Sequence, residues 1–187
     1  MTNATDIDGT SAEDLTKATI VCRRQLDDIV KYLREYAPGY ENCFIIGSAS
    51  LIGIRETRHF KGKYTLTEQD ILEAKVFDDY VVKDAFFNFD VHNITGSGLD
   101  KTGVQKHFSQ SKGYTIPYGC LVPEVKKGLL LCGRNISGTH MAHSNFRAMP
   151  ICVGIGEAAG AAAAVAVKKG CETADVSAAE IREITGA

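Results

Sequence analysis

Residues 129–168 of this chain read LLLCGRNISGTHMAHSNFRAMPICVGIGEAAGAAAAVAVK. The stretch begins with a short apolar run bounded by glycines, which predicts a strand buried on both faces over residues 129–132. A glycine–arginine turn and a loop with two histidines follow, and then a long run of very small residues. This order is typical of a place where the backbone comes close to a flat or phosphorylated ligand.

The run of small residues predicts a helix over residues 149–169, with Pro150 in the first turn, where proline is favoured. Glycine costs about 1 kcal/mol relative to alanine in a helix interior, so Gly154, Gly156 and Gly160 need a compensating reason. Close packing of the helix against a sheet or another backbone supplies one. The segment GIGEAAG is not a dinucleotide-binding fingerprint, because its third glycine comes one residue too late and the motif lies inside a helix.

Two places in this stretch suit a ligand. Gly133 and Arg134 directly follow the predicted strand, and open α/β sheets bind ligands beyond the carboxyl ends of their strands. Glycine lets the backbone approach a ligand there, and arginine pairs with phosphate; the alternative is an ordinary turn with a surface arginine. The helix start at residues 147–151 carries unpaired N–H groups and favours a negatively charged ligand atom; the alternative is an ordinary terminus capped by water.

Four further side chains are candidates for chemistry. His140 and His143 are candidate proton donors, as histidine side chains often are, and they would share a helix face if this loop is locally helical. No third ligand accompanies them, so we expect no metal site. Arg55 and Arg58 lie in the run RETRH, where strand-like alternation would put them on opposite faces. This run is either an anion clamp for a substrate or cofactor or an exposed edge of mixed charge.

Helix and strand signals cover most of the remaining chain. Thr10 and Glu13 have the spacing of a capping box, and apolar residues then recur at helical spacing until Pro38 and Gly39 end the helix. The other predicted elements are a strand at 43–46, an extended segment at 52–60, a short helix opened by a second capping box at 67–70 and running through residue 77, a half-buried strand at 87–91, a loop at 92–112, an extended segment at 114–118 and a last helix at 177–184.

Composition excludes several classes of protein. The 187 residues carry a net charge of −2 with the two signs mixed, so we expect no nucleic-acid partner. The polar, acidic N-terminus is unlike a signal peptide. The six cysteines form no CxxC pair and most lie in apolar surroundings, so we expect buried, reduced thiols and a cytoplasmic protein. A membrane span at residues 151–167 is not favoured, because Glu157 interrupts it and alanine and glycine contribute little transfer energy.

Four motifs, in this order, resemble the C-terminal portion of a family of FAD-dependent oxidoreductases that is related in fold to the glutathione reductase and fumarate reductase flavoproteins. They are EDLTKA with a helix ending in APGYEN, then IGIRETRHFKGKYTLTEQDIL, then YTIPYGCLVP, and then the stretch from LLLCGRNIS to GEAAGAAAA. Together they cover roughly residues 8 to 170. GIRETR with YTLTEQD, and GRNIS with RAMP and GEAAG, carry the resemblance most specifically.

The resemblance implies an α/β fold, or α+β for this chain by itself, that forms the C-terminal part of a two-domain, Rossmann-like flavoprotein. Residues 1–112 would belong to the substrate-facing domain, and residues 113–187 would return to the FAD-binding domain. The implied cofactor is FAD, whose ring would be contacted by the turn and the helix start: Gly133, Arg134, Asn135, Arg147, Ala148, Met149 and Ile151. The implied candidates for catalysis or substrate contact are His140, His143, Arg55 and Arg58.

The family begins with a strand, a GxGxxG turn and a helix that bind the ADP half of FAD, and nothing in this chain matches that unit. We therefore expect a fragment, or one of two partner chains, that binds FAD weakly or not at all until the missing FAD-binding half is supplied. The expected activity is hydride or electron transfer to or from a small-molecule substrate, and the chain could also form a homo-oligomer. The alternative is a non-catalytic partner subunit or interaction module that docks through its alanine- and glycine-rich helix.

Overall fold

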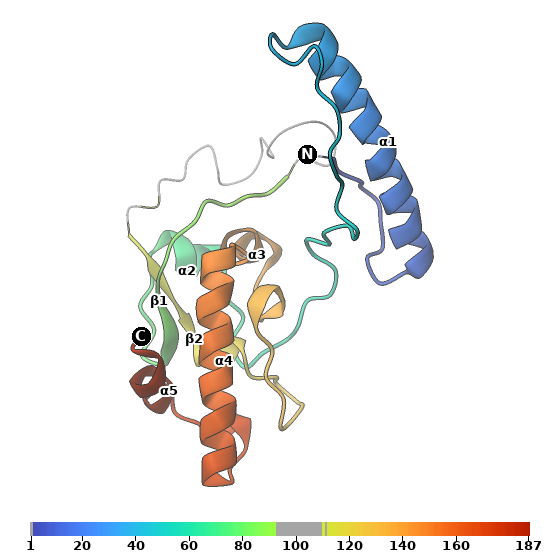
Figure 1. Cartoon of the computed structure of the whole chain (residues 1–187). Coiled ribbons are helices and arrows are strands. Elements are labelled where there is room, and N and C mark those ends of the chain that lie inside the picture. Colours follow the sequence, from blue (N-terminus) through green and yellow to red (C-terminus); the bar gives the residue numbers. More distant parts are fainter. Residues whose placement is uncertain (1, 93–109, 111) are drawn as a thin grey trace. The chain divides into compact units, whose positions relative to one another are not determined.

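The computed structural model describes residues 2–92, 110 and 112–187 (Figure 1). The chain divides into two compact units, Met1–Thr57 (unit 1) and Arg58–Ala187 (unit 2). The sequence predicts a different boundary at residue 112, between a substrate-facing region and the segment that returns to the FAD-binding domain. That boundary remains a prediction. The predicted loop at 92–112 lies almost wholly outside the described residues.

Unit 1 is built on one long helix, α1 (Ala12–Tyr36), as the apolar periodicity predicts. The predicted cap is wrong by one residue. The side chain of Ser11, not Thr10, accepts a hydrogen bond from the backbone N–H of Asp14 at 3.3 Å. Thr10 instead donates its hydroxyl and its backbone N–H to the carboxylate of Asp8, at 2.7 and 2.8 Å. The helix therefore starts where the Ser11 side chain satisfies one of its free N–H groups, that of Asp14.

The chain after α1 is irregular, and the strand predicted at residues 43–46 is wrong. Residues 52–60 also form no strand. A strand is stable only when its backbone groups pair with a neighbour, and the described part of unit 1 offers no second strand. Phe44 and Ile46 are consequently exposed.

Unit 2 is organised around two antiparallel strands, β1 (Tyr80–Ala85) and β2 (Tyr114–Pro117). The extended segment predicted around β2 is confirmed, with Pro117 at the strand's end, where its missing N–H does no harm. The strand predicted at 87–91 is wrong: β1 ends at Ala85, and the backbone of Phe87 and Asp90 bonds to Asn145 and Ser144 of the helix at 140–146, not to a strand. Register shifts interrupt the β1–β2 pairing, and both Val81 and Val82 are buried, so β1 shows no simple alternation.

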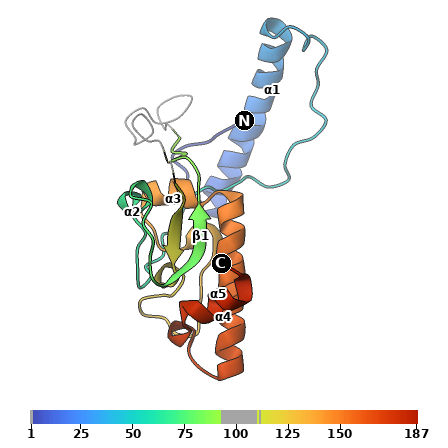
Figure 2. The same cartoon turned by 90° about the vertical axis from the view of Figure 1, so that its left-hand side faces the viewer.

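The helix α4 (Met149–Lys169) contacts β1, and α5 (Ala178–Thr185) contacts both (Figures 1 and 2). Both helices match the predictions, including the capping box of α5. A Cβ at Gly154 would lie 3.5 Å from a methyl group of Val82, which is an ordinary van der Waals distance, so this contact does not require a glycine. At Gly156 and Gly160 the same construction meets open space, so contacts among the described residues explain none of the three glycines.

Five short helical segments complete the described part of unit 2. The capping box at 67–70 is confirmed and opens α2 (Glu68–Leu72), which ends before the predicted residue 77. The helix α3 (His140–Phe146) lies next to α2. The remaining segments are the 3-10 turns η2 (Tyr118–Cys120), η3 (Gly133–Asn135) and η4 (Thr173–Asp175).

The strand predicted at 129–132 is wrong, and so is its burial on both faces. Leu129 and Cys132 are exposed, and no described strand lies beside them. One backbone hydrogen bond holds this run, from Leu131 N–H to the carbonyl of Leu121 at 3.0 Å. Four consecutive apolar residues indicate burial, but a strand also needs a neighbouring strand to pair with its backbone.

One described helix, α4, is long and apolar enough to cross a membrane by length and composition alone. Within unit 2, 39% of its most apolar window is buried, and a core helix of a globular protein meets the same criteria. The expectation that α4 is not a membrane span remains a prediction.

Candidate functional site

The turn η3 contacts the helix α4 within unit 2, and the charge of Arg134 in η3 acts on Cys152 near the start of α4. The candidate site consists of η3 and the start of α4. Gly133 adopts a left-handed conformation, with φ of 71°, and a Cβ built on it meets open space. Glycine takes this conformation without strain, and it leaves the backbone open to close approach. Arg134 and Asn135, which complete η3, are exposed.

The start of α4 presents backbone donors. Ala148 is the N-cap, and no side chain caps the helix. The Cys152 N–H already bonds the Ala148 carbonyl at 2.9 Å, and Pro150 has no N–H. Helix geometry therefore leaves the N–H groups of Met149 and Ile151 without intrahelical partners. Met149 is 83% exposed, whereas the side chain of Ile151 is buried in the core, so only the backbone of Ile151 can serve a ligand.

Two arginine charges lie near the first turn of α4. Burial raises the pKa of the Cys152 thiol, and the positive charges of Arg134 and Arg147 act in the opposite direction. Of the six free cysteines, Cys120 is buried as predicted, Cys132 is exposed and the others are half-buried. The charges of Arg134 and Arg147 thus act at the start of α4.

Arg147 is already engaged with Asp90. Its Nη2 donates to the backbone carbonyl of Asp90 at 2.8 Å and to the carboxylate at 2.7 Å, and the side chain is only 18% exposed. Nε2 of His92 lies 3.1 Å from the other carboxylate oxygen. Arg147 therefore ties the segment around Asp90 to the junction of α3 and α4.

The predicted local helix at the two histidines is confirmed as α3, but burial separates them. His140 is exposed, and His143 is only 5% exposed. The ring of His143 packs against His59, with centroids 5.9 Å apart, and edge-on against Phe146 at 5.4 Å. Nδ1 of His59 lies 3.1 Å from the carbonyl of Gly138, which can only accept, so Nδ1 carries the proton.

Arg55 and Arg58 fall on either side of the division between the units. Arg55 belongs to unit 1, where it lines a cavity. Arg58 is the exposed first residue of unit 2. The anion clamp predicted for this run remains a prediction.

Sequence reasoning missed the polar contacts that hold α3 in place. The Tyr114 hydroxyl donates to Oδ1 of buried Asn145 at 2.8 Å, and Nδ2 of Asn145 donates to the carbonyl of Phe87. Burial raises the pKa of Tyr114 far above its usual range, so this hydroxyl stays a donor. No local pattern signals these contacts, because the partners lie 31 and 58 residues apart in the sequence.

No group of three or more His, Cys, Asp or Glu side chains that could hold a metal ion occurs among the described residues. The candidate site therefore offers backbone donors and arginines and no metal-ligand set in this part of the chain.

A family model described as FAD dependent oxidoreductase matches residues 1–184. The match covers almost the whole chain, so the chain belongs to this family. Its cofactor is FAD, and its broad role is that of a flavoprotein oxidoreductase. No curated protein and no solved structure matches the chain. The closer relation to glutathione reductase and fumarate reductase remains a prediction.

The candidate site fits one end of FAD. Open backbone at Gly133 and first-turn donors at α4 suit a flat ring with acceptor atoms at its edge. The pyrophosphate of FAD needs a strand, a glycine-rich turn and a helix, and the described residues contain only the antiparallel pair β1–β2. The predicted contact with the flavin ring is compatible with these residues and remains a prediction.

Proposed function

We propose that this chain provides the flavin-ring contacts and part of the substrate-facing surface of an FAD-dependent oxidoreductase. The observation that carries the proposal is the contact between η3, which has the open backbone of Gly133, and α4, whose first turn has the backbone donors. Family membership supports the same cofactor. The substrate is a small molecule, and the reaction is hydride or electron transfer.

The backbone at this place would bind and polarise the ring edge. The N–H groups of Met149 and Ile151 would donate to its acceptor atoms, and Gly133 would let the ring lie against the chain. FAD supplies the acceptance and release of hydride or electrons when it is bound. The positive end of the α4 dipole favours nearby negative charge by about 0.3–1 kcal/mol. Arg134 would add its charge, and Arg147 would position the helix start through Asp90.

We assign the two histidines of α3 different roles. His140 is exposed and would exchange a proton with the substrate. His143 is buried between His59 and Phe146, so it would position α3 and would not touch the reacting atoms. Arg55 and Arg58 stay candidates for holding an anionic group.

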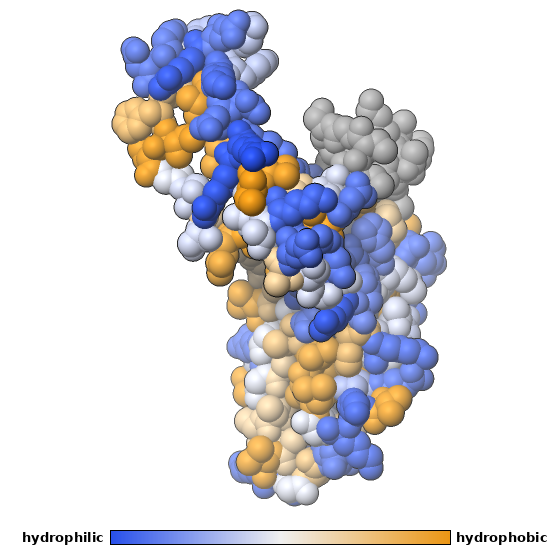
Figure 3. Space-filling view, turned by 90° about the vertical axis from the view of Figure 1, so that its right-hand side faces the viewer, coloured by the Kyte–Doolittle hydropathy of each residue, from blue (hydrophilic) through white to orange (hydrophobic). Residues whose placement is uncertain are grey.

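The exposed side of α4 is suited to bind a partner. Met149, Val153 and Val167 are 83%, 69% and 83% exposed, and Gly156 and Gly160 meet nothing within 4 Å. Figure 3 shows apolar side chains gathered over the part of this view that unit 2 occupies. We propose that this side receives the Rossmann-like half that binds the ADP part of FAD, in a longer chain or a separate subunit. A non-catalytic interaction module is the alternative that the same surface favours.

A titration of the 187-residue chain with FAD, followed by the visible flavin spectrum, tests the proposal. Ring contacts alone predict weak binding, with a Kd of about 0.1 mM, or roughly 5.5 kcal/mol. Gly133→Val should weaken binding about tenfold, or about 1.4 kcal/mol, because its side chain would occupy the ring's place. Gly128→Val is the matched control, since Gly128 also has positive φ and open surroundings but lies outside η3.

The Gly128→Val chain should bind FAD like the unchanged chain. A flavin spectrum that does not change up to about 1 mM FAD would contradict the flavoenzyme proposal and favour the interaction module. Equal weakening by the two valine variants would show that backbone strain, and not contact at η3, explains the loss.

A further inference from the structure

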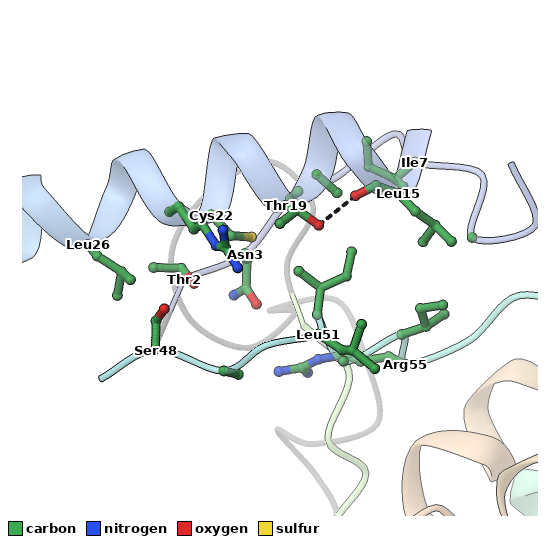
Figure 4. A pocket seen from close by; sticks show the side chains of 18 of the residues that line it. Thr2, Asn3, Ile7, Leu15, Thr19, Cys22, Leu26, Ser48, Leu51 and Arg55 are labelled. Atoms are coloured by element: carbon green, nitrogen blue, oxygen red, sulfur yellow. Dashed lines mark hydrogen bonds between the residues drawn. The ribbon is translucent and has the colours of Figure 1, made fainter. Parts of the chain in front are cut away.

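Unit 1 contains a cavity of about 340 Å³ between α1 and two segments outside the helix, residues 2–9 and 48–56 (Figure 4). This volume lies within the range of small-molecule sites. Apolar side chains line it from both sides: Leu15, Ala18, Cys22 and Leu26 on α1, and Leu51 and Ile54 opposite. The cavity can therefore shield an apolar group from water.

Contacts within unit 1 fix these walls. The backbone N–H of Asn3 donates to Oε1 of Gln25 at 3.0 Å, and Nε2 of Gln25 donates back to the Asn3 carbonyl at 2.8 Å. This pair ties the start of the chain to α1. Gly9 packs so closely against Thr57 that a Cβ at Gly9 would overlap its methyl group. The segments around the cavity thus hold one another in place.

The charged side chains of the wall are paired or hydrated. Arg55 and Glu56 already have interaction partners, and Arg23 is exposed to water. A charged group that entered the cavity would lose its hydration without gaining an unpaired opposite charge from these three side chains. The wall therefore favours a neutral ligand.

Two uncharged polar side chains lie on the more exposed side of the cavity. Asn3 and Ser48 both line it and are exposed, whereas Ala18 on α1 is only 3% exposed. Figure 4 shows the amide of Asn3 and the hydroxyl of Ser48 in the space between α1 and the chain opposite. Amide and hydroxyl groups can both donate and accept hydrogen bonds, as a ligand hydroxyl can. The cavity thus combines an apolar interior with neutral hydrogen-bonding groups near its opening.

We propose that this cavity binds a small neutral alcohol with an apolar body. The body lies against the apolar side chains of α1 and of the opposite segment, and the hydroxyl lies beside Asn3 and Ser48. The proposal does not depend on the function proposed for unit 2, because every lining residue belongs to unit 1.

Benzyl alcohol is the probe, and the alkylation rate of Cys22 in the full chain is the readout. Cys22 lines the cavity, whereas Cys43, also half-buried in unit 1, does not. Benzyl alcohol at about ten times its Kd should slow iodoacetamide labelling of Cys22 about tenfold, because the unoccupied fraction falls in that proportion. Peptide mass spectrometry should show no change at Cys43. Benzoate has the same ring but carries a charge, so it should give no protection at the same concentration.

Matched variants test whether the protection comes from the cavity. Ala18→Leu places a larger side chain in the buried part of the wall, so it should abolish the protection. Ala12→Leu is the control, since Ala12 is exposed on α1 and does not line the cavity, and it should keep the protection. The comparison of benzyl alcohol with benzoate uses the unchanged chain, so it decides the matter if Ala18→Leu fails to fold.

Four results would overturn the proposal. They are absent protection in the unchanged chain, equal protection by benzoate, equal slowing at Cys43, and protection that survives in a folded Ala18→Leu chain or disappears in a folded Ala12→Leu chain.

Discussion

Gly138→Ala should destabilise unit 2, because the glycine lies directly against a buried ring. A Cβ at Gly138 would overlap Cε1 of Phe146 and lie 3.0 Å from its Cζ. Phe146 is fully buried and packs edge-on against His143, so it cannot turn into solvent. The carbonyl of Gly138 also accepts from His59, and its backbone bridges to Leu66. Any shift of the backbone to relieve the overlap would disturb these contacts.

Overpacking of this kind costs about 1–3 kcal/mol, and we expect a loss in that range. Urea unfolding should show a lower midpoint with an unchanged m-value, and the melting temperature should fall by roughly 3 to 10 °C. Gly160→Ala is the matched control, since Gly160 is exposed inside α4 with open space around it. It should stabilise the chain by about 0.5–1 kcal/mol. A neutral Gly138→Ala, or the same sign for both variants, would refute the packing argument.

Three further substitutions test the contacts around the site. Asp70→Asn should cost about 1–3 kcal/mol at neutral pH. Burial alone would raise the pKa of Asp70, but hydrogen bonds from Lys75, Thr67 and Tyr64 outweigh it and hold the pKa below its usual value. The stability difference should therefore be full above about pH 4 and disappear as acid protonates the native carboxyl; a difference independent of pH would contradict this. Arg147→Gln should cost about 1–3 kcal/mol in thermal unfolding by breaking the ion pair with Asp90, and an unchanged melting temperature would exclude that role. Ser177→Ala should cost about 1 kcal/mol by removing the cap of α5, which denaturant unfolding would detect, and no loss would mean that Glu180 alone suffices.

The helices could be predicted because their signals are local. The periodicity of α1, the boxes at Thr67 and Ser177, and the proline and glycine at the ends of α4 each lie within a few residues. Three predicted strands are wrong for one physical reason. The apolar runs at 43–46 and 129–132 and the alternating apolar residues at 87–91 indicate burial. A strand also needs a neighbouring strand, which such a local pattern does not specify.

The site could be predicted only in part. The turn η3 and the helix α4 lie close together in the sequence, so the contact between them follows from local order. The partners of Arg147 and His143 lie far away in the sequence, at Asp90 and His59, and no spacing rule connects them. Tertiary packing alone pairs these residues.

Amide chemical shifts of the ¹⁵N-labelled chain, measured with and without FAD, test the central claim most directly. We predict that the N–H signals of Gly133, Met149 and Ile151 shift on addition of FAD, and shift further when the flavin is reduced and carries negative charge. Gly170, at the other end of α4, should not respond. Bound FAD that leaves these three amides unchanged, or that shifts only amides elsewhere, would contradict the assignment of η3 and the start of α4 to the flavin ring.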